Sequence, residues 1–358
     1  MRKYPYDLGG SSWVTRLHLL LLAGVLALAG PVPLCGEDSD CLQVGREVAN
    51  KGWLLFSAQT PAGDFDLFIS RPDGSARRNL TDSREWSEFG ARFSPDGKRI
   101  LYRRLLHEPK AMVNHGMWGA MGELVIANAD GSHPVLFGGH GEYPWASWSP
   151  DGKQLACLYK REGKIKFIDI ASKKVVREMP RQGIFQQLYW SPDGKRLVGT
   201  ANMEGYDWNV EMIELDNEKA TMISRGLNCT PDWFEGDSNR VIYSNRLPGL
   251  GSEYGWTTLM QATADGKSRS LVYAERGRHI YYGCTSPDNR YAIFSFPKTD
   301  GGTDGPLAII RLADAPIIVP DDFKEMHALY PNAKSGPVFR LTQPGFEPHW
   351  TYAEIGGP

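Results

Sequence analysis

The feature that most constrains the fold is a short phrase that recurs along the chain. Its three clearest copies read FSPDGKRILY, WSPDGKQLACLY and WSPDGKRLVGT, and looser ones read WFEGDSNRVIYS, TSPDNRYAIFS and HWTYAE. The residues that we call the anchors are Phe93, Trp148, Trp190, Trp233, Thr285 and Trp350. Successive anchors are 55, 42, 43, 52 and 65 positions apart. Repeats of roughly 40 to 50 residues with several strands each are typical of β-propeller blades.

The chemistry of the repeated turn predicts a β-hairpin at each copy. Proline presets φ at the second turn position, aspartate bonds its own backbone, and glycine adopts the positive φ that other residues avoid. A second hairpin with an Asp-Gly turn follows, as in DLFISRPDGSARRNLT, ELVIANADGSHPVLF and TLMQATADGKSRSL. Two hairpins in succession predict a four-stranded antiparallel blade.

The two ends of the repeat region predict how the ring closes. The copy around Trp350 has an inner strand but no return strand, whereas residues 53–57 form a return strand without an inner partner. Pairing these two strands completes a blade and removes two exposed sheet edges. The sequence therefore predicts an all-β, six-bladed propeller over residues 52–355, nearly without helix.

The units WSPDGKQLACLY and DFDLFISRPDGSARRNLT resemble the repeats of the TolB-like, or PD40 (WD40-like), β-propeller family. The resemblance covers nearly the whole chain from about Gly52 to Ile355 and implies the propeller fold. It implies no single activity, because such repeats occur in periplasmic TolB, in prolyl-oligopeptidase-type propellers, in oligogalacturonate lyases and in other exported proteins.

The N-terminus has the order of a secretory signal. Basic residues precede an uncharged apolar run at 17–29, and small residues at Ala27 and Ala29 fit a cleavage site. We expect residues 1–29 to be a signal peptide, 30–51 a short linker, and the protein to be periplasmic or secreted. An uncleaved signal anchor, which would associate the protein with a membrane, is the alternative.

Composition limits the partners and the cysteine chemistry. The chain has 40 Lys and Arg against 42 Asp and Glu, a net charge of -2, so we expect no nucleic-acid partner. Cys157, Cys229 and Cys284 fall in predicted strands and are expected to be small buried hydrophobes. Cys35 and Cys41 are close enough in sequence to form a disulfide in an oxidising compartment.

Enzyme motifs are missing from the sequence. It contains no G-x-S-x-G nucleophile elbow, and His107-Glu108 does not open an HExxH zinc motif because Ala111 stands where the second histidine belongs. We therefore favour a non-catalytic scaffold that needs no cofactor and binds a protein or another component of the cell envelope.

The connections of the predicted blades fall on two faces. We call the face with the Ser-Pro-Asp-Gly and Asp-Gly turns the turn face, and the opposite one the long-loop face. A long connection at 105–122 lies on the latter, and such loops commonly carry binding residues. The candidates for contact with a partner on the long-loop face are Trp118, His140, Tyr143, Trp145, Gln187, Tyr254, Trp256, Tyr282 and Glu347.

The alternative hypothesis is a metal-dependent, carbohydrate-active lyase or hydrolase resembling oligogalacturonate-lyase propellers. Imidazoles suit zinc- or manganese-like ions, but a metal site needs three or four ligands that meet. The available histidines, with His140 among the contact candidates above, are His107, His115, His279 and His349. Nothing in their spacing requires them to converge.

Export is the first testable prediction. We expect the mature protein to begin near Gly30, because the Ala27-x-Ala29 pattern matches signal-peptidase specificity. Intact-mass measurement and N-terminal sequencing of the exported protein test this. Full-length protein that stays in the cytoplasm would contradict it.

Overall fold

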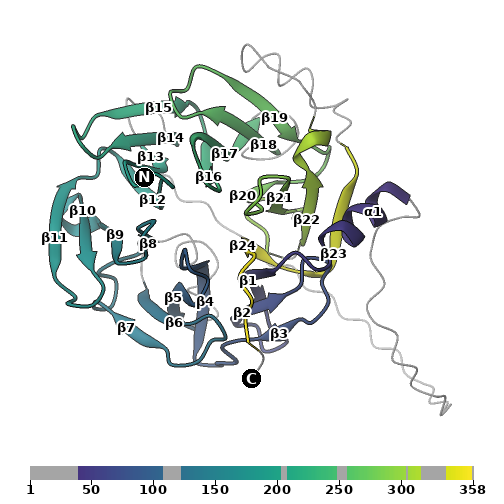
Figure 1. The fold of residues 1–358 in the computed structure, drawn as a ribbon, viewed down its shortest axis with the longest axis horizontal. Helices are drawn as coiled ribbons and strands as arrows, with labels where there is room; N and C mark the ends of the chain where they lie inside the picture. The colour runs from purple at the N-terminus through teal and green to yellow at the C-terminus, as the bar shows by residue number, and fades with distance from the viewer. Residues whose placement is uncertain are drawn as a thin grey trace, which may run out of the picture. The chain divides into compact units, whose positions relative to one another are not determined.

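The computed structural model describes residues 39–107, 122–202, 208–247, 256–303, 305–315 and 336–356. Six four-stranded antiparallel sheets stand around a common axis and form a six-bladed propeller (Figure 1). No helix in the described ranges is long and apolar enough to cross a membrane.

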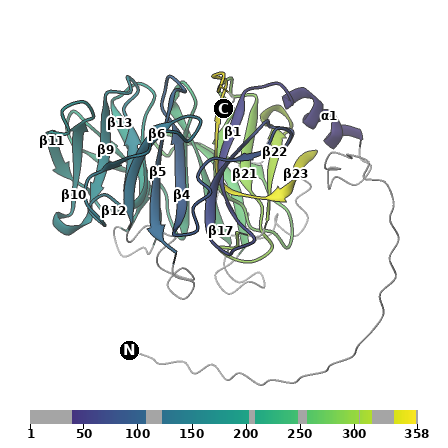
Figure 2. The same ribbon diagram turned by 90° about the horizontal axis from the view of Figure 1, so that it is seen from below.

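Each blade runs from an inner strand beside the axis to an outer strand at the periphery (Figures 1 and 2). Blade 1 consists of β24 (Phe346–Thr351), β1 (Trp53–Gln59), β2 (Phe65–Ser70) and β3 (Arg78–Asn79). Blade 2 consists of β4 (Trp86–Phe93), β5 (Arg99–Leu106), β6 (Glu123–Asn128) and β7 (Val135–Phe137). Blade 3 consists of β8 (Trp145–Trp148), β9 (Gln154–Tyr159), β10 (Lys164–Asp169) and β11 (Val175–Pro180).

The other three blades repeat this order. Blade 4 consists of β12 (Ile184–Trp190), β13 (Arg196–Ala201), β14 (Asn209–Glu214) and β15 (Ala220–Ser224). Blade 5 consists of β16 (Asn228–Phe234), β17 (Asp237–Leu247), β18 (Trp256–Thr263) and β19 (Arg269–Tyr273). Blade 6 consists of β20 (Tyr281–Thr285), β21 (Tyr291–Ser295), β22 (Pro306–Arg311) and β23 (Val338–Pro344). Short 3₁₀ turns span Lys160–Glu162 and Leu312–Asp314.

The predicted closure is confirmed. Strand β24 pairs antiparallel with β1, with Trp350 opposite Leu54 and His349 opposite Leu55. The indole of Trp350 donates a hydrogen bond to the Lys51 carbonyl at 2.6 Å, and its ring is 1% exposed. The C-terminal strand is thus fixed to the N-terminal strands by both its backbone and its largest side chain.

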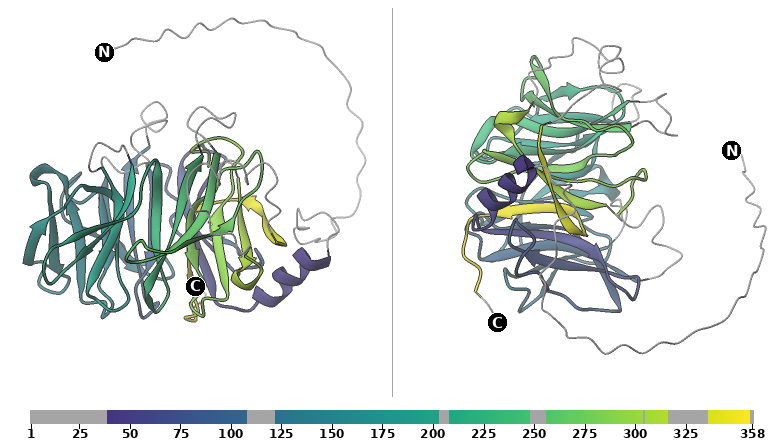
Figure 3. Two further views of the ribbon diagram at one scale, coloured as in Figure 1. Left: turned by 90° about the horizontal axis from the view of Figure 1, so that it is seen from above. Right: turned by 90° about the vertical axis from the view of Figure 1, so that its right-hand side faces the viewer.

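Helix α1 (Ser39–Val48) was not predicted from the sequence, and it packs on β22 and β23 of blade 6 (Figures 1 and 3). Val44 and Val48 are fully buried in the core that blades 1 and 6 share. Glu47 accepts hydrogen bonds from the Arg311 guanidinium at 2.8 and 2.9 Å and from the Tyr291 hydroxyl at 3.0 Å. The bonds from Arg311 hold the pKa of Glu47 at about 2, so this helix remains attached by a charged pair at neutral pH.

A β-bulge interrupts the inner strand of five blades, three residues before the anchor. The residues at this position, which we call the bulge residues, have φ between 48° and 63°, and they are Gly90, Gln187, Thr230, Tyr282 and Glu347. Four of the five are not glycine, and each such backbone costs about 1–3 kcal/mol. The bulge frees a backbone N–H from the sheet and turns the following residues toward the axis.

Side-chain oxygens of the preceding blade accept four of these five N–H groups. Thr230 N donates to Thr200 Oγ1 at 3.2 Å, and Tyr282 N donates to Thr230 Oγ1 at 3.2 Å. Glu347 N donates to Ser295 Oγ at 3.2 Å, and Gly90 N donates to the Glu347 carboxylate. Consecutive blades from 4 through 5, 6 and 1 to 2 are thereby hydrogen-bonded at the level of the bulges.

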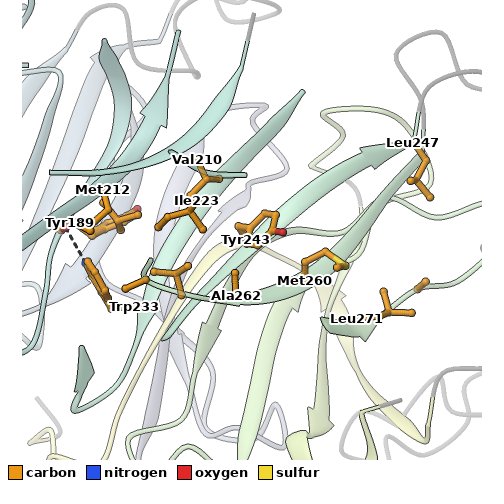
Figure 4. Close-up of a cluster of buried hydrophobic side chains, with 14 residues drawn as sticks. Tyr189, Val210, Met212, Ile223, Trp233, Tyr243, Leu247, Met260, Ala262 and Leu271 are labelled. Atoms are coloured by element: carbon orange, nitrogen blue, oxygen red, sulfur yellow. Dashed lines mark hydrogen bonds between the residues drawn. The ribbon is translucent and has the colours of Figure 1, made fainter. Parts of the chain in front are cut away.

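Tryptophan anchors add a second set of bonds between blades, nearer the turn face. Trp148 Nε1 donates to the Arg92 carbonyl at 3.3 Å, and Trp233 Nε1 donates to the Tyr189 carbonyl at 3.1 Å. Figure 4 shows the second of these bonds beside the apolar cluster that joins blades 4 and 5. The repeated aromatic anchor therefore both fills and hydrogen-bonds the junction between two blades.

The bonds at the bulges generate the second prediction. Thr200 is fully buried, and its hydroxyl accepts the Thr230 N–H while donating to Gln187 Oε1. Thr200→Val keeps the side-chain volume but leaves a buried N–H and a buried amide oxygen without their partner, so we expect a loss of about 1–3 kcal/mol in the free energy of unfolding. Urea denaturation measures the change.

The matched control is Thr221→Val on the outer strand β15, where the side chain is half-buried. We expect it to change the free energy of unfolding by about 0.5 kcal/mol or less. Equal effects of the two substitutions would show that the bonds at the bulges do not hold the blades together.

Candidate functional site

The axis of the propeller is lined by residues at two fixed positions of the repeat. The residues immediately before the anchors, which we call the axial residues, are Arg92, Ser147, Tyr189, Asp232, Cys284 and His349. The residues two positions after the anchors, which we call the rim residues, are Pro95, Pro150, Pro192, Glu235, Pro287 and Tyr352.

These residues surround a central cavity of about 470 Å³, which we call the funnel. All six rim residues and five of the axial residues line it, and Cys284 is the exception. Because the rim residues belong to the Ser-Pro-Asp-Gly turns and their equivalents, the funnel opens on the turn face. The loop lengths in the sequence favoured the opposite face.

An ion pair crosses the funnel. Arg92 Nη1 lies 2.8 Å from Asp232 Oδ2, and the two side chains are 9% and 15% exposed. They come from blades 2 and 5, which face each other across the axis of a six-bladed ring. The guanidinium also lies 4.3 Å from the centre of the Tyr189 ring. Burial alone would lower the pKa of Arg92, but the nearby Asp232 carboxylate opposes this effect. The pKa lies above its usual value, and the guanidinium stays charged.

His349 and Glu235 lie beside this pair. The backbone N–H of Phe93 donates to His349 Nδ1 at 3.0 Å, so Nδ1 must carry a lone pair and we assign the ring proton to Nε2. His349 Nε2 points to Glu235 Oε1 at 3.8 Å, which is beyond hydrogen-bonding distance. The next blade therefore fixes the orientation of the His349 ring, and its Nε2 faces the Glu235 carboxylate.

Buried side chains lie on the long-loop side of the axial residues. Glu347 is 3% exposed, and burial raises its pKa while the nearby Arg103 guanidinium opposes that rise. Farther toward the long-loop face, Phe65, Phe89 and Phe346 pack with ring centroids 5.3–5.8 Å apart. These three rings come from strands β2, β4 and β24 and pack at the junction of blades 1 and 2.

Several predicted contact residues form the interior wall. Trp145, Gln187, Tyr282 and Glu347 are 1–4% exposed, and the last three are bulge residues. The Glu347 carboxylate is occupied by the Gly90 N–H and Gln187 Oε1 by the Thr200 hydroxyl. Their side chains stabilise the ring from inside.

The other described candidates are spread over the long-loop face. Tyr143 is buried against Tyr159, whereas His140 is exposed. Trp256 stacks on His279 with ring centroids 4.6 Å apart, and burial lowers the pKa of His279 to about 4. His115, Trp118 and Tyr254 lie outside the described residues.

The histidines proposed as metal ligands do not come together where they are described. His107 Nδ1 lies 3.2 Å from Ser87 Oγ, His279 is enclosed by aromatic rings, and His349 lines the funnel on the turn-face side. Within the described ranges, no three His, Cys, Asp or Glu residues are grouped as a metal site would require.

The charged residues of the funnel were not predicted from the sequence, and they are Arg92, Asp232 and Glu235. A signal for them was present, because aligning the six copies places Arg92 and Asp232 in one column and Glu235 in a column of prolines. Charged residues at repeat positions that face the axis therefore indicate where the cavity lies, whereas loop length does not.

Comparison with known proteins gives the fold. No protein-family model and no curated protein matches the sequence. TolB from Acinetobacter baumannii superposes with a TM-score of 0.60 at 16% identity over 84% of this chain, which spans 66% of that TolB. A putative TolB from Agrobacterium tumefaciens gives a TM-score of 0.54 at 17% identity, covering 84% of this chain and 94% of the other. A chain of the nidogen/laminin complex gives 0.53 at 11% identity, covering 76% and 95%.

The ion pair across the funnel generates the third prediction. Asp232→Asn leaves the buried Arg92 guanidinium without its counter-charge, so we expect the free energy of unfolding to fall by about 3–5 kcal/mol. Arg92→Met combined with Asp232→Leu removes both charges together and should recover most of that loss. Urea denaturation of the three proteins gives the comparison.

Asp237→Asn is the control, because Asp237 pairs with Arg240 at 2.7 Å in an exposed turn. Such surface pairs contribute about 1 kcal/mol or less. If Asp232→Asn is no more destabilising than this control, the pair does not stabilise the ring.

Proposed function

We propose that this protein is an exported, non-catalytic binding propeller that holds a protein partner of the cell envelope in the funnel of its turn face. The observation that carries the proposal is the funnel itself, an open cavity of about 470 Å³ on the axis that is lined by strand ends, turns and a few polar groups. Such cavities are the usual binding sites of rigid scaffolds. The charged start and apolar run at 17–29 support export.

The polar groups of the funnel support binding rather than catalysis. His349 Nδ1 accepts a backbone N–H, Asp232 holds Arg92, and burial raises the pKa of Tyr189 to about 12. A general base needs a free lone pair and a pKa near the operating pH. The lone pair of His349 Nδ1 and the carboxylate of Asp232 are used in structural bonds, and the Tyr189 hydroxyl keeps its proton at neutral pH. Groups fixed in this way are well suited to recognising a partner.

The rim also favours a protein partner. Four of the six rim residues are prolines, which present apolar surface on turns whose backbone is already fixed. Binding to a preorganised apolar rim loses little conformational entropy. The fold shared with the TolB structures is compatible with this proposal and does not select it over other propeller functions.

A photo-crosslinking experiment in the native host is the fourth prediction. A photoreactive amino acid replaces Pro150, which is exposed on the rim of the funnel. We expect irradiation to produce a discrete crosslinked protein band, because a partner seated in the funnel contacts this position. Mass spectrometry of the band identifies the partner.

The same amino acid at His140, which is exposed on the long-loop face, is the matched control. We expect no specific crosslink from this position. Crosslinks from His140 alone would place the partner on the long-loop face and contradict the proposed site. Crosslinks from neither position would contradict partner binding by these two faces.

A further inference from the structure

The rim of the funnel is apolar except at one residue. In the rim position, four blades have proline and blade 1 has Tyr352, whereas blade 5 has Glu235. The turn of blade 5 reads FEGDSN in place of SPDGK, so Glu235 replaces the turn proline directly. The ring of repeats thus carries a single acidic rim residue.

The charge of Glu235 is not neutralised by its neighbours. Its side chain is 42% exposed, and the His349 ring lies beside it, with 3.8 Å between Nε2 and Oε1, which is beyond hydrogen-bonding distance. The single guanidinium that lines the funnel, Arg92, is paired with Asp232. Among the described residues, no lysine or arginine pairs with Glu235. The central part of the funnel therefore has a net negative charge.

Aspartates of the turns do not change this balance. Asp96 also lines the funnel, but Ser94 Oγ and Lys98 N donate to it at 2.6 and 3.1 Å, and these bonds lower its pKa. The Asp96 carboxylate stabilises its own turn through these bonds, and the nearby positive charges of Lys98 and Arg99 also lower its pKa. Glu235 is left as the carboxylate that faces a ligand.

The walls suit the rest of a long basic side chain. Proline rings and the ring of Trp190 provide surface between the rim and the ion pair, whereas the guanidinium groups of Arg92 and Arg99 already lie over the rings of Tyr189 and Trp148. Lysine and arginine pack their methylene groups along apolar surface while the charged end reaches a carboxylate. Aromatic faces add a favourable interaction with a cation.

A second cavity lies next to the funnel and offers a path for the rest of a bound peptide segment. It has a volume of about 790 Å³ and lies between blades 3 and 4 on the same face. Trp190 lines both cavities. Its Nε1 is buried and has no hydrogen-bond partner in the described structure, unlike the indoles of Trp148 and Trp233, whereas its backbone N–H donates to Ser147 Oγ of blade 3 at 2.9 Å. Three basic and three acidic side chains line this groove, so its charge is balanced.

From these observations we infer that the funnel binds a lysine or arginine side chain of an extended protein segment, with the cation beside Glu235. The segment then crosses Trp190 and enters the groove between blades 3 and 4. This inference rests on the proposed function and deepens it by naming the chemistry of the partner. Glu235 provides the unpaired charge of the rim, and the charges of the groove are balanced. The basic residue of the segment therefore contributes most to specificity.

Selection from a displayed library of random peptides on the full-length protein tests the inference and is the fifth prediction. We expect the recovered peptides to share a lysine or arginine. Isothermal titration then compares the wild type with Glu235→Gln, and the peptide with an analogue in which citrulline replaces arginine, or norleucine replaces lysine. Each change alone should weaken binding about tenfold or more, because a charge-assisted bond is lost.

The two changes together identify the contact. If the basic residue lies beside Glu235, combining Glu235→Gln with the neutral peptide should weaken binding little more than either change alone. Trp190→Ala should also weaken binding, because the segment crosses this ring. Glu162→Gln makes the same charge change on the long-loop face and should leave the affinity unchanged.

The outcomes separate the inference from the function on which it rests. A bulky substitution at Pro150 that blocks peptide binding shows that the peptides bind in the funnel. If such peptides share no basic residue, or if Glu235→Gln does not change their affinity, the inference is overturned and the binding funnel is left in place. Recovery of no peptide that binds the wild type above background would overturn both. Basic peptides with strong coupling to Glu235 would support both.

Discussion

The rest of the structure depends on the hydrogen bonds that the bulge residues make to the preceding blade. Strand pairing joins strands only within a blade, so neighbouring blades are held together by apolar packing and by hydrogen bonds that involve side chains, such as those of the Trp148 and Trp233 indoles. The bulge in β16, for example, releases the Thr230 N–H, and the Thr200 hydroxyl of blade 4 accepts it. The left-handed backbone at these positions is unfavourable for residues with a side chain. The bonds between blades offset that cost, and they turn the residues after each bulge toward the axis.

The ion pair of Arg92 and Asp232 then determines what kind of space the axis contains. Two opposite blades reach across it and meet at 2.8 Å, while Glu347 and a set of phenylalanine rings fill the layers below. A buried pair of this kind gains little stability over apolar residues, but it is strongly destabilising to break. Because separating the two charges would cost several kcal/mol, Arg92 and Asp232 are a fixed part of the funnel lining. The rim residues define the entrance of the funnel on the turn face.

Much of the fold could be predicted from the sequence because its signals are local. The Ser-Pro-Asp-Gly turns give the hairpins, the spacing of the anchors gives the blades, and the incomplete copies at 53–57 and around Trp350 give the closure. The bulges could not be predicted, because Gln187, Thr230 and Glu347 have no preference for positive φ, and the tertiary structure imposes it. Helix α1 was missed for a similar reason, since its stability comes from Arg311 and from the core of blades 1 and 6. The site was sought where the loops are long, whereas the cavity lies where the turns are short.

The way in which the repeat is broken explains how a ring of similar blades can bind one partner in one orientation. A rim of six identical turns would offer six equivalent contacts, and a ligand could rotate among them. Here blade 5 replaces the rim proline with Glu235, blade 1 replaces it with Tyr352, and the groove on Trp190 opens beside blade 4. The charge and the groove lie on neighbouring blades, so a segment that satisfies both has a fixed direction across the face. Specificity in this molecule thus comes from the few positions at which the copies differ, and rigidity comes from those at which they agree.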